Sequence, residues 1–165
     1  MIKKHYLSFL LFFAAVLFLS LGSCDPARKY EKAETEAIAN FLSSNPTDTF
    51  KLESSGLYYR DIIVGTGRAP QTGDTAHVVY TGKYLNGTVF DTNTGGADLI
   101  FPVNEGYLIA GFDEGVTYMK EGGSAEFLIP SKLGYGSQGY YTIGGYTPLL
   151  YDVQLVKVIP GPTKK

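Results

Sequence analysis

Tryptophan is absent from this chain of 165 residues, and cysteine, methionine and histidine are rare, with one, two and two copies. The single cysteine, Cys24, excludes an intramolecular disulfide, so packing and hydrogen bonds must hold the fold. One cysteine and two histidines do not supply the ligand cluster of a structural zinc site, and we predict neither a metal nor a cofactor. No serine or cysteine lies in a nucleophile elbow, which leaves covalent catalysis without a candidate residue.

Positive charge is also in short supply. The chain has 14 Lys and Arg residues against 16 Asp and Glu residues, a formal net charge of −2. Without a basic patch, nucleic acid is not a predicted partner, because phosphate binding needs clustered Lys and Arg. Glycine and aromatic residues are plentiful instead, with 20 Gly, 13 Tyr and 10 Phe, which favours a β-rich fold with many turns. The length suits one globular domain with short extensions.

The N-terminus has the pattern of an export signal. Two lysines precede an almost wholly apolar run from Leu7 to Leu21, which suits a signal-peptide core and is short for a spanning helix of about 20 residues. The run ends in Leu21-Gly22-Ser23-Cys24, which resembles the lipobox of bacterial lipoproteins. We therefore expect residues 1–23 to be a signal peptide and Cys24 to be lipidated. An ordinary cleavable signal followed by a chance cysteine is the alternative.

Residues 24–52 are predicted to link a membrane to the folded domain. Acyl chains on Cys24 contribute about 0.8 kcal/mol per buried methylene. We therefore expect a lipid-anchored protein of the bacterial cell envelope, on the periplasmic or surface side of the outer membrane. Asp25-Pro26 suits a helix start, and apolar residues recur at helical spacing until Ser43-Ser44-Asn45-Pro46. This predicts an amphipathic helix of about four turns, whose apolar stripe packs on the domain or on a second copy; a partner-binding helix is the alternative.

The stretch from Tyr80 to Asp91 brings chemically useful side chains together. Asn86-Gly87 favours a two-residue hairpin turn with positive φ, flanked by two short strands. Because side chains alternate along a strand, Tyr80 and the Phe90-Asp91 pair can meet in one place. There the tyrosine hydroxyl can donate a hydrogen bond to the carboxylate, which a carboxylate beside apolar rings requires. The alternative is a half-buried hairpin whose aspartate only caps a turn.

Further strands and one short helix follow from the hydrophobic pattern. Strands are predicted at Leu57–Val64, Thr75–Thr81, Ser124–Ile129 and Leu149–Leu155, and a helix at Phe112–Met119. His77 lies on the opposite face of its strand from Tyr80, which predicts a solvent-facing side chain rather than a ligand or base. Residues 134–146 are rich in Gly and Tyr and predict a surface loop that carries rings.

Many short motifs occur along the chain in a single order. They are Gly65-Thr-Gly67, Gly73-Asp74, Tyr80-Thr-Gly82, Gly87-Thr-Val-Phe-Asp91, Gly111-Phe-Asp-Glu-Gly-Val116, Met119-Lys120, Ile129-Pro130, Tyr135-Gly136 and Tyr151-Asp-Val-Gln-Leu155. In this order they resemble the FKBP-type peptidyl-prolyl isomerases across residues 53–160, which we take as the domain, with 161–165 as a tail. The resemblance implies an α+β fold: a curved antiparallel sheet of about five strands wrapped around one short α-helix, here with an N-terminal helical extension.

The resemblance also implies a ligand pocket between sheet and helix. Matched position by position, the catalytic residues would be Tyr80, Phe90, Asp91, Ile109, Phe112 and Tyr135, and the substrate-binding residues Leu99, Leu108, Ile143 and Tyr151, to which Tyr140 adds a further ring. Phe112 would form the floor, and Tyr80 would hold Asp91. The Ile109 N–H and the Tyr135 hydroxyl would hydrogen-bond carbonyl groups of the substrate.

Such a pocket fits rotation about Xaa-Pro bonds, whose barrier of about 18–20 kcal/mol arises from amide resonance. Aromatic walls disfavour the polar planar amide and tolerate the twisted one, without an acid, base or nucleophile. The expected partners are proline-containing polypeptides during folding of exported proteins, and macrolide-type inhibitors. Three positions depart from the family pattern. Leu99 stands where an aromatic residue is common, Phe112 where Trp is common, and Gly144-Gly145 where Pro-Pro is common. The glycine pair predicts that the loop after Ile143 is looser than usual. A non-catalytic chaperone or peptide-binding lipoprotein, or a lipoprotein that serves only assembly, are the alternatives.

Overall fold

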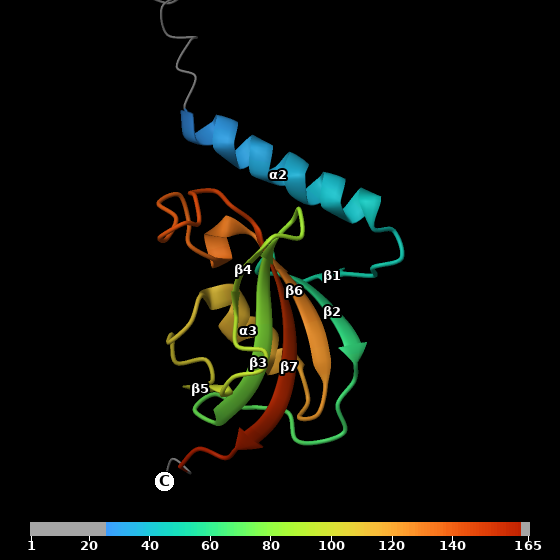
Figure 1. Cartoon of the computed structure of the whole chain (residues 1–165), viewed down its shortest axis with the longest axis vertical. Coiled ribbons are helices and arrows are strands. Elements are labelled where there is room, and N and C mark those ends of the chain that lie inside the picture. Colours follow the sequence, from blue (N-terminus) through green and yellow to red (C-terminus); the bar gives the residue numbers. More distant parts are fainter. Residues whose placement is uncertain (1–25, 163–165) are drawn as a thin grey trace, which may run out of the picture. The chain divides into compact units, whose positions relative to one another are not determined.

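The computed structural model describes residues 26–162, so the predicted signal peptide, Cys24 and the last three residues lie outside the described part. The elements, in chain order, are α2 (Pro26–Ser44), β1 (Lys51–Leu52), β2 (Tyr58–Ile63), β3 (Thr75–Tyr84), β4 (Val89–Thr92), β5 (Leu99–Pro102), α3 (Ala110–Tyr118), β6 (Ser124–Ile129), the 3-10 turn η1 (Ser131–Leu133) and β7 (Leu149–Ile159) (Figure 1). Within residues 26–162, neither α2 nor α3 combines the length and hydrophobicity that crossing a bilayer requires.

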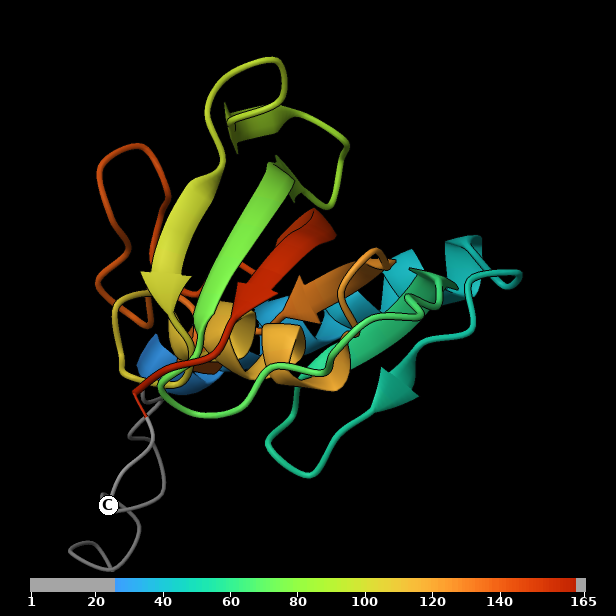
Figure 2. The same ribbon diagram turned by 90° about the horizontal axis from the view of Figure 1, so that it is seen from below.

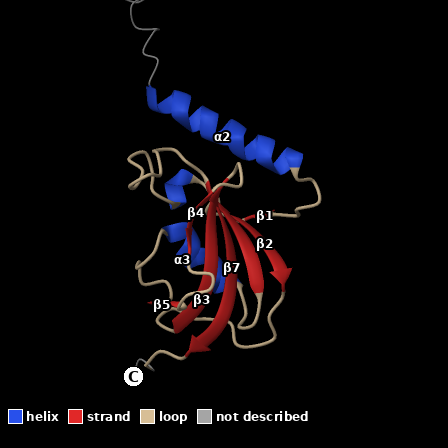
Figure 3. Cartoon of the chain, viewed as in Figure 1, coloured by secondary structure: helices blue, strands red, loops and turns tan. Residues whose placement is uncertain are grey.

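The strands form one antiparallel sheet in the order β1-β2-β6-β7-β3-β4, in which β5 also pairs with β3 (Figure 3). The sheet has seven strands, whereas about five were predicted. Two short pieces explain the difference: β1 has two residues, and the edge of β3 that faces away from β7 is shared by β4 and β5. The predicted α+β fold, a curved sheet against one short helix, is confirmed.

Helix α3 lies against one face of the curved sheet (Figure 2). Phe112 and Val116 of the helix pack with Phe127 of β6 in the main core. The approach is close, because a Cβ at Gly115 would lie 2.7 Å from the Phe127 ring. Asp113 is buried in the first turn of α3 and accepts hydrogen bonds from backbone N–H groups of the preceding loop, residues 104 and 106. The helix and the loop that precedes it are therefore fixed as one piece.

The turn between β3 and β4 differs from the prediction. The Tyr84 carbonyl accepts a hydrogen bond from the Gly87 N–H, and the Tyr84 N–H donates to the Thr88 carbonyl, both at 2.9 Å. Three residues therefore form the loop, and among residues 85–87 only Gly87 has a positive φ, +85°. Asn86 instead uses its side-chain oxygen to accept from the Thr88 N–H at 3.0 Å. This is the three-residue hairpin loop that ends in a glycine bulge.

Helix α2 has 19 residues and is longer than the predicted four turns. The chain divides into two units between Glu31 and Lys32, within this helix. In the second unit, Ile38 is 7% exposed and packs with Leu128 of β6 and Leu150 of β7, whose side chains point away from the face that α3 covers. Of the two predicted docking places for the apolar stripe, the structure therefore shows the domain itself.

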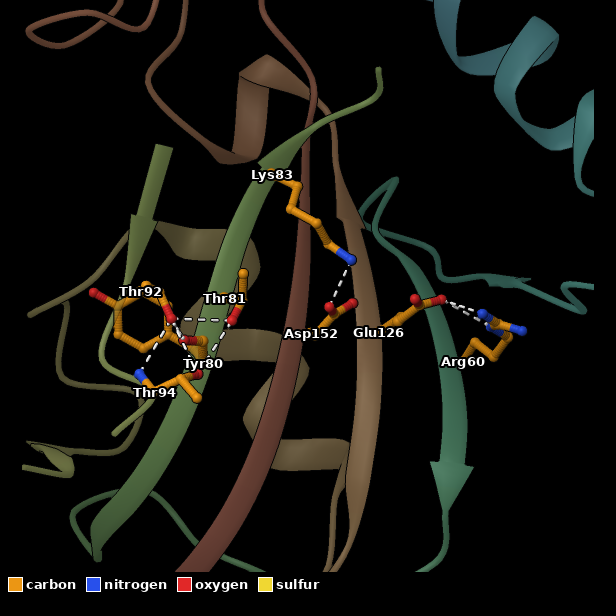
Figure 4. A network of polar contacts seen from close by, with 8 residues as sticks. All are labelled: Arg60, Tyr80, Thr81, Lys83, Thr92, Thr94, Glu126 and Asp152. Carbon is orange, nitrogen blue, oxygen red and sulfur yellow. Dashed lines mark hydrogen bonds and ion pairs between the residues drawn. The ribbon is translucent and has the colours of Figure 1, made fainter. Parts of the chain in front are cut away.

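The outer face of the sheet carries a row of charged side chains (Figure 4). Lys83 of β3 pairs with Asp152 of β7 at 2.6 Å, and Glu126 of β6 pairs with Arg60 of β2. Glu126 and Asp152 are neighbours across the β6–β7 pair, so two carboxylates lie side by side. His77, predicted to face solvent, has a side chain only 20% exposed, with Nδ1 3.5 Å from a carboxylate oxygen of Asp98.

Candidate functional site

A hollow of about 400 Å³ opens between the sheet and the N-terminal end of α3. Its lining comes from β3, the β4–β5 region, the segment before α3, α3 itself, the loop after η1, and β7. The lining residues are Tyr80, Asp91, Leu99, Tyr107, Leu108, Ile109, Phe112, Tyr135, Tyr140 and Tyr151. Segments far apart in the sequence thus converge on one largely aromatic surface.

The floor of the hollow is Phe112, which is 3% exposed. Its ring meets four others edge to face, at centroid distances of 5.8 Å to Tyr80, 6.1 Å to Phe101, 5.8 Å to Phe127 and 5.2 Å to Tyr151. Edge-to-face pairs are favourable because the positive edge of one ring meets the negative face of another. The ring is therefore held in one orientation, with its remaining surface toward the hollow.

The rim carries one polar pair. The Tyr80 hydroxyl donates a hydrogen bond to a carboxylate oxygen of Asp91 at 2.6 Å, as predicted. Burial, the hydrogen bond and the charge of Asp91 together raise the pKa of Tyr80 well above its usual value, so the hydroxyl stays protonated at physiological pH. The pair therefore keeps a carboxylate beside the aromatic rings with one of its oxygens satisfied.

A β-bulge sets the position of this carboxylate. Gly82 is opposite Asp91 in the β3–β4 ladder, whereas Lys83 is opposite Val89, so Phe90 is the extra residue. A bulge lets consecutive side chains depart from strict alternation. Asp91 consequently reaches the hollow, while Phe90 packs behind it against Tyr151, with ring centroids 5.6 Å apart.

The backbone next to Tyr80 is anchored by a residue that the sequence did not single out. Asn93 accepts a hydrogen bond from the Tyr80 N–H at 2.7 Å and donates to the carbonyls of Val78 and Ala97. Thr92 adds a hydroxyl that donates to the Tyr80 carbonyl at 2.9 Å (Figure 4). The only sequence signal was an asparagine in a Thr- and Gly-rich loop, a common setting for side-chain bonds to the backbone.

Two residues that line the hollow, Ile109 and Tyr135, carry hydrogen-bond donors. Ile109 is the N-cap of α3, and among the described residues no backbone carbonyl accepts from its N–H. An unpaired amide at a helix start is a ready donor to an oxygen of a ligand. Tyr135 lies in the loop after η1, and burial raises the pKa of its hydroxyl, which therefore remains a donor. Both residues line the hollow, and their contacts to substrate carbonyls stay predictions.

The loop after η1 covers one side of the hollow. Tyr140 stacks on Tyr135, with centroids 5.0 Å apart and the planes at 10°. Tyr140 also forms a bridge with Ile143, which is 7% exposed in the core. The predicted looseness of the glycine pair stays a prediction. Gly145 has a steric reason for its identity, since a Cβ there would lie 2.0 Å from the Ser137 carbonyl oxygen.

Nine of the eleven residues predicted for the pocket line the hollow. The exceptions are Phe90, which packs behind Tyr151, and Ile143, which is buried in the core under the loop. Both support the walls instead of forming them. Tyr107 was missed; it precedes two predicted residues, and its 73% exposure at the mouth left no hydrophobic pattern to follow. The roles of the lining residues in binding or catalysis remain predictions.

A curved antiparallel sheet against a short helix, with a largely aromatic hollow between them, defines a class of small α+β domains. The model of one family of such domains, described as FKBP-type peptidyl-prolyl cis-trans isomerase, matches residues 66–156. The chain belongs to this family.

Relatives of known sequence or structure agree. A probable FKBP-type peptidyl-prolyl cis-trans isomerase, FkpA, of Neisseria meningitidis is 40% identical over 141 residues, which cover 80% of this chain and 51% of that protein. FK506-binding protein 4 of Neurospora crassa is 38% identical over 133 residues, which cover 80% of this chain and 28% of that protein. A solved peptidyl-prolyl cis-trans isomerase from Pseudomonas syringae superimposes with a TM-score of 0.71 at 26% identity and covers 84% of this chain and 100% of that one. The chain thus spans about half of the Neisseria relative and about a quarter of the Neurospora relative.

Proposed function

We propose that this protein catalyses cis–trans isomerisation of Xaa-Pro bonds in polypeptides and so assists the folding of exported proteins. The observation that carries the proposal is that the Phe112 floor, the Tyr80–Asp91 pair and Ile109 surround one hollow, and that no backbone carbonyl of the described residues accepts from the Ile109 N–H. Family membership supports it. Uncatalysed isomerisation takes tens of seconds, long enough to limit folding.

The hollow suits the twisted amide better than the planar one. Rotation about the C–N bond removes resonance, so the amide becomes less polar as the barrier is approached. Aromatic walls that exclude water therefore favour the transition state over the ground state, which is the requirement for catalysis. Lowering the barrier by about 8 kcal/mol would accelerate rotation roughly a millionfold.

Each polar group then has a task. A proline ring would rest on Phe112, and the Ile109 N–H would donate to a carbonyl next to the rotating bond. The Tyr135 hydroxyl would hold a second carbonyl. Asp91, fixed by Tyr80, would place negative charge near the carbonyl carbon, which becomes more positive when resonance is lost. No proton is transferred and no covalent bond is made or broken.

A proline-peptide isomerisation assay on the full chain tests the proposal. We expect catalysis well above the buffer rate, a loss of about tenfold or more in kcat/KM for Phe112→Ala, because the floor is removed, and a smaller loss for Asp91→Ala. Val64→Ala, a change at an exposed aliphatic residue away from the hollow, should match the wild type. A folded wild-type protein that does not exceed the buffer rate would exclude the enzyme.

A binding module or chaperone is the second candidate, and the exposed rings at the mouth favour it. Tyr107, Tyr140 and Tyr141 are 73%, 54% and 92% exposed. Exposed aromatic side chains that surround a hollow can hold apolar segments of unfolded chains. This candidate predicts suppression of aggregation that survives Phe112→Ala and is reduced when the three tyrosines are replaced together by serine.

We further propose a cell-envelope location through a lipid on Cys24, with residues 1–23 as a signal peptide, 24–52 as the linking segment and 53–160 as the isomerase domain. Membrane fractionation of the wild type and Cys24→Ser tests the anchor: only the wild type should stay with the membrane. The name of the Neurospora relative supports a macrolide such as FK506 as a ligand of the same hollow. Competition between this macrolide and a proline peptide would test that assignment.

A further inference from the structure

A carboxylate of α2 reaches the segment that leads into the Tyr135 loop. Both oxygens of Glu34 are used: one accepts from the Ser131 N–H at 2.5 Å, and the other accepts from the Ser131 hydroxyl at 2.7 Å. Ser131 is 4% exposed and is one of three buried polar or charged residues in the described chain. Its two donors would lack these partners without Glu34, and a buried unpaired donor is unfavourable.

Ser131 also anchors the loop that carries Tyr135. It begins η1, and its carbonyl accepts hydrogen bonds from the N–H groups of Gly134 at 2.9 Å and Gly136 at 2.8 Å. Tyr135 lies between these two glycines. All hydrogen-bonding groups of Ser131 therefore serve one arrangement: Glu34 holds its N–H and hydroxyl, and its carbonyl holds the backbone on both sides of Tyr135.

Glu34 is itself held in place. Ile38, one helical turn further along α2, is buried against Leu128 and Leu150 of the sheet. Residues four apart lie on the same face of a helix, so burial of Ile38 directs Glu34 toward the same surface. Glu34 lies outside residues 66–156, the part matched by the family model. The contact thus comes from the N-terminal extension and reaches into the isomerase domain.

We propose that Glu34 is a positioning residue for the isomerase reaction: through Ser131 it fixes the loop that presents the Tyr135 hydroxyl and the stacked Tyr140 ring to the substrate. The N-terminal helix is then part of the working domain and more than a spacer. This inference rests on the proposed isomerase function, which it deepens by giving the extension a role in the site.

Three variants of the full chain test it. Glu34→Ala removes both acceptors, Glu34→Gln keeps one oxygen, and Glu36→Ala changes an exposed glutamate of the same helix, whose contact is an ion pair with Lys32. We expect kcat to fall about three- to tenfold in Glu34→Ala, less in Glu34→Gln, and not at all in Glu36→Ala, because displaced contact groups slow the reaction without loss of the hollow.

Amide hydrogen exchange supplies the readout that a purely structural role would not change. In Glu34→Ala, exchange at the Gly134 and Gly136 N–H groups should accelerate about tenfold, while the β6 amides keep their protection. Unchanged kcat and unchanged Gly136 exchange would overturn the inference, as would an equal acceleration at Gly136 and throughout β6. Should Glu34→Ala fail to fold, Glu34→Gln decides by the same two measurements.

The two proposals can fail separately. A wild type without isomerase activity removes the proposed function and with it the role of Glu34 in the reaction, while Gly136 exchange still decides whether Glu34 fixes the loop that carries Tyr135. A Ser131→Ala background gives a further check. Because the hydroxyl contact is already absent there, Glu34→Ala should cost less kcat than in the wild type; an equal loss in both backgrounds would place the effect of Glu34 elsewhere.

Discussion

Tyr80 joins three kinds of contact in a single residue. Its ring meets Phe112 edge to face, its hydroxyl donates to Asp91, and its N–H donates to Asn93. The ring contributes to the wall of the hollow and the hydroxyl orients the rim carboxylate. The two contributions can be separated, because phenylalanine keeps the ring and removes only the hydroxyl.

Tyr80→Phe should lower kcat/KM about three- to tenfold with little change in folding, since a hydrogen bond to a charged group contributes about 1.5–3 kcal/mol when buried and less at an open rim. Tyr118→Phe is the matched control, because the Tyr118 hydroxyl also donates to a carboxylate, Glu114 at 2.7 Å, away from the hollow. Isomerase kinetics measure the change in kcat/KM of the two variants, and thermal unfolding measures the change in their stability. Equal effects of the two variants would mean that the Tyr80–Asp91 pair has no special role.

Single residues also show what the sequence could predict about the site. The sequence could place Tyr80, Asp91 and Phe112 together because each belongs to a motif with a fixed place in the family fold. The resemblance placed Phe90 in the wall, whereas the bulge leaves it packed behind Tyr151, and strand alternation cannot reveal a bulge. Tyr107 and Asn93 were missed because an exposed ring and a loop asparagine follow no periodic pattern; their roles depend on contacts between distant segments.

Among the elements, α3 shows packing and helix propensity in opposition. Alanine is favoured over glycine in a helix by about 1 kcal/mol. At Gly115, however, a Cβ would lie 2.7 Å from the ring of Phe127, which is fully buried and meets Phe112 edge to face. Packing should prevail, since overfilling a tight core costs about 1–3 kcal/mol and the ring cannot move without disturbing its neighbours.

Gly115→Ala is therefore expected to lower the free energy of unfolding by about 1–2 kcal/mol and to reduce kcat/KM, because α3 and the Phe112 floor shift away from the sheet. Chemical denaturation and isomerase kinetics would show both effects. In a Phe127→Leu background the smaller side chain leaves room, and the same substitution should become neutral or stabilising. If Gly115→Ala stabilised the protein while Phe127 is unchanged, this account would be contradicted.

The strands and helices were easier to predict than their pairing. Richness in Tyr and Ile located β2, and period-two patterns located β3, β6 and β7, with errors of a few residues at the ends; 3.6-residue periodicity located α2. The sharing of one β3 edge between β4 and β5 could not be predicted, because it depends on the bulge and on the loop between them. The docking place of α2 was left open for another reason: an apolar stripe on a helix does not specify the surface that it packs against.

Across the whole molecule, two carboxylates act on stability in opposite directions. Asp74 is buried and accepts hydrogen bonds from the Gly161 and Gln71 N–H groups and from the Arg68 side chain. The bond from Gly161 joins the start of β3 to the end of the domain. The bond from Gly161 is the largest of the effects that lower its pKa. Its stabilisation is therefore present above the ordinary aspartate pKa and is lost as the pH falls through the lowered value.

The pKa of Glu126 is shifted in the opposite direction, upward. Burial is the main cause that raises its pKa, and Asp152 beside it adds to the shift, while Arg60 opposes it. A raised pKa favours the protonated form in the folded state. Its stabilisation is therefore complete below about pH 4.5, the ordinary glutamate value, and is lost as the pH rises through the raised value.

Glu126→Gln removes this titration and, at neutral pH, replaces a carboxylate by an amide whose N–H can donate to Asp152. The acceptor would be Oδ1 of Asp152, a buried oxygen without a hydrogen-bond partner among the described residues. The free energy of unfolding of the variant relative to the wild type should therefore rise from pH 4.5 to pH 8, as measured by chemical denaturation. A pH-independent difference for Glu126→Gln would mean that Arg60 outweighs burial and keeps this carboxylate charged throughout.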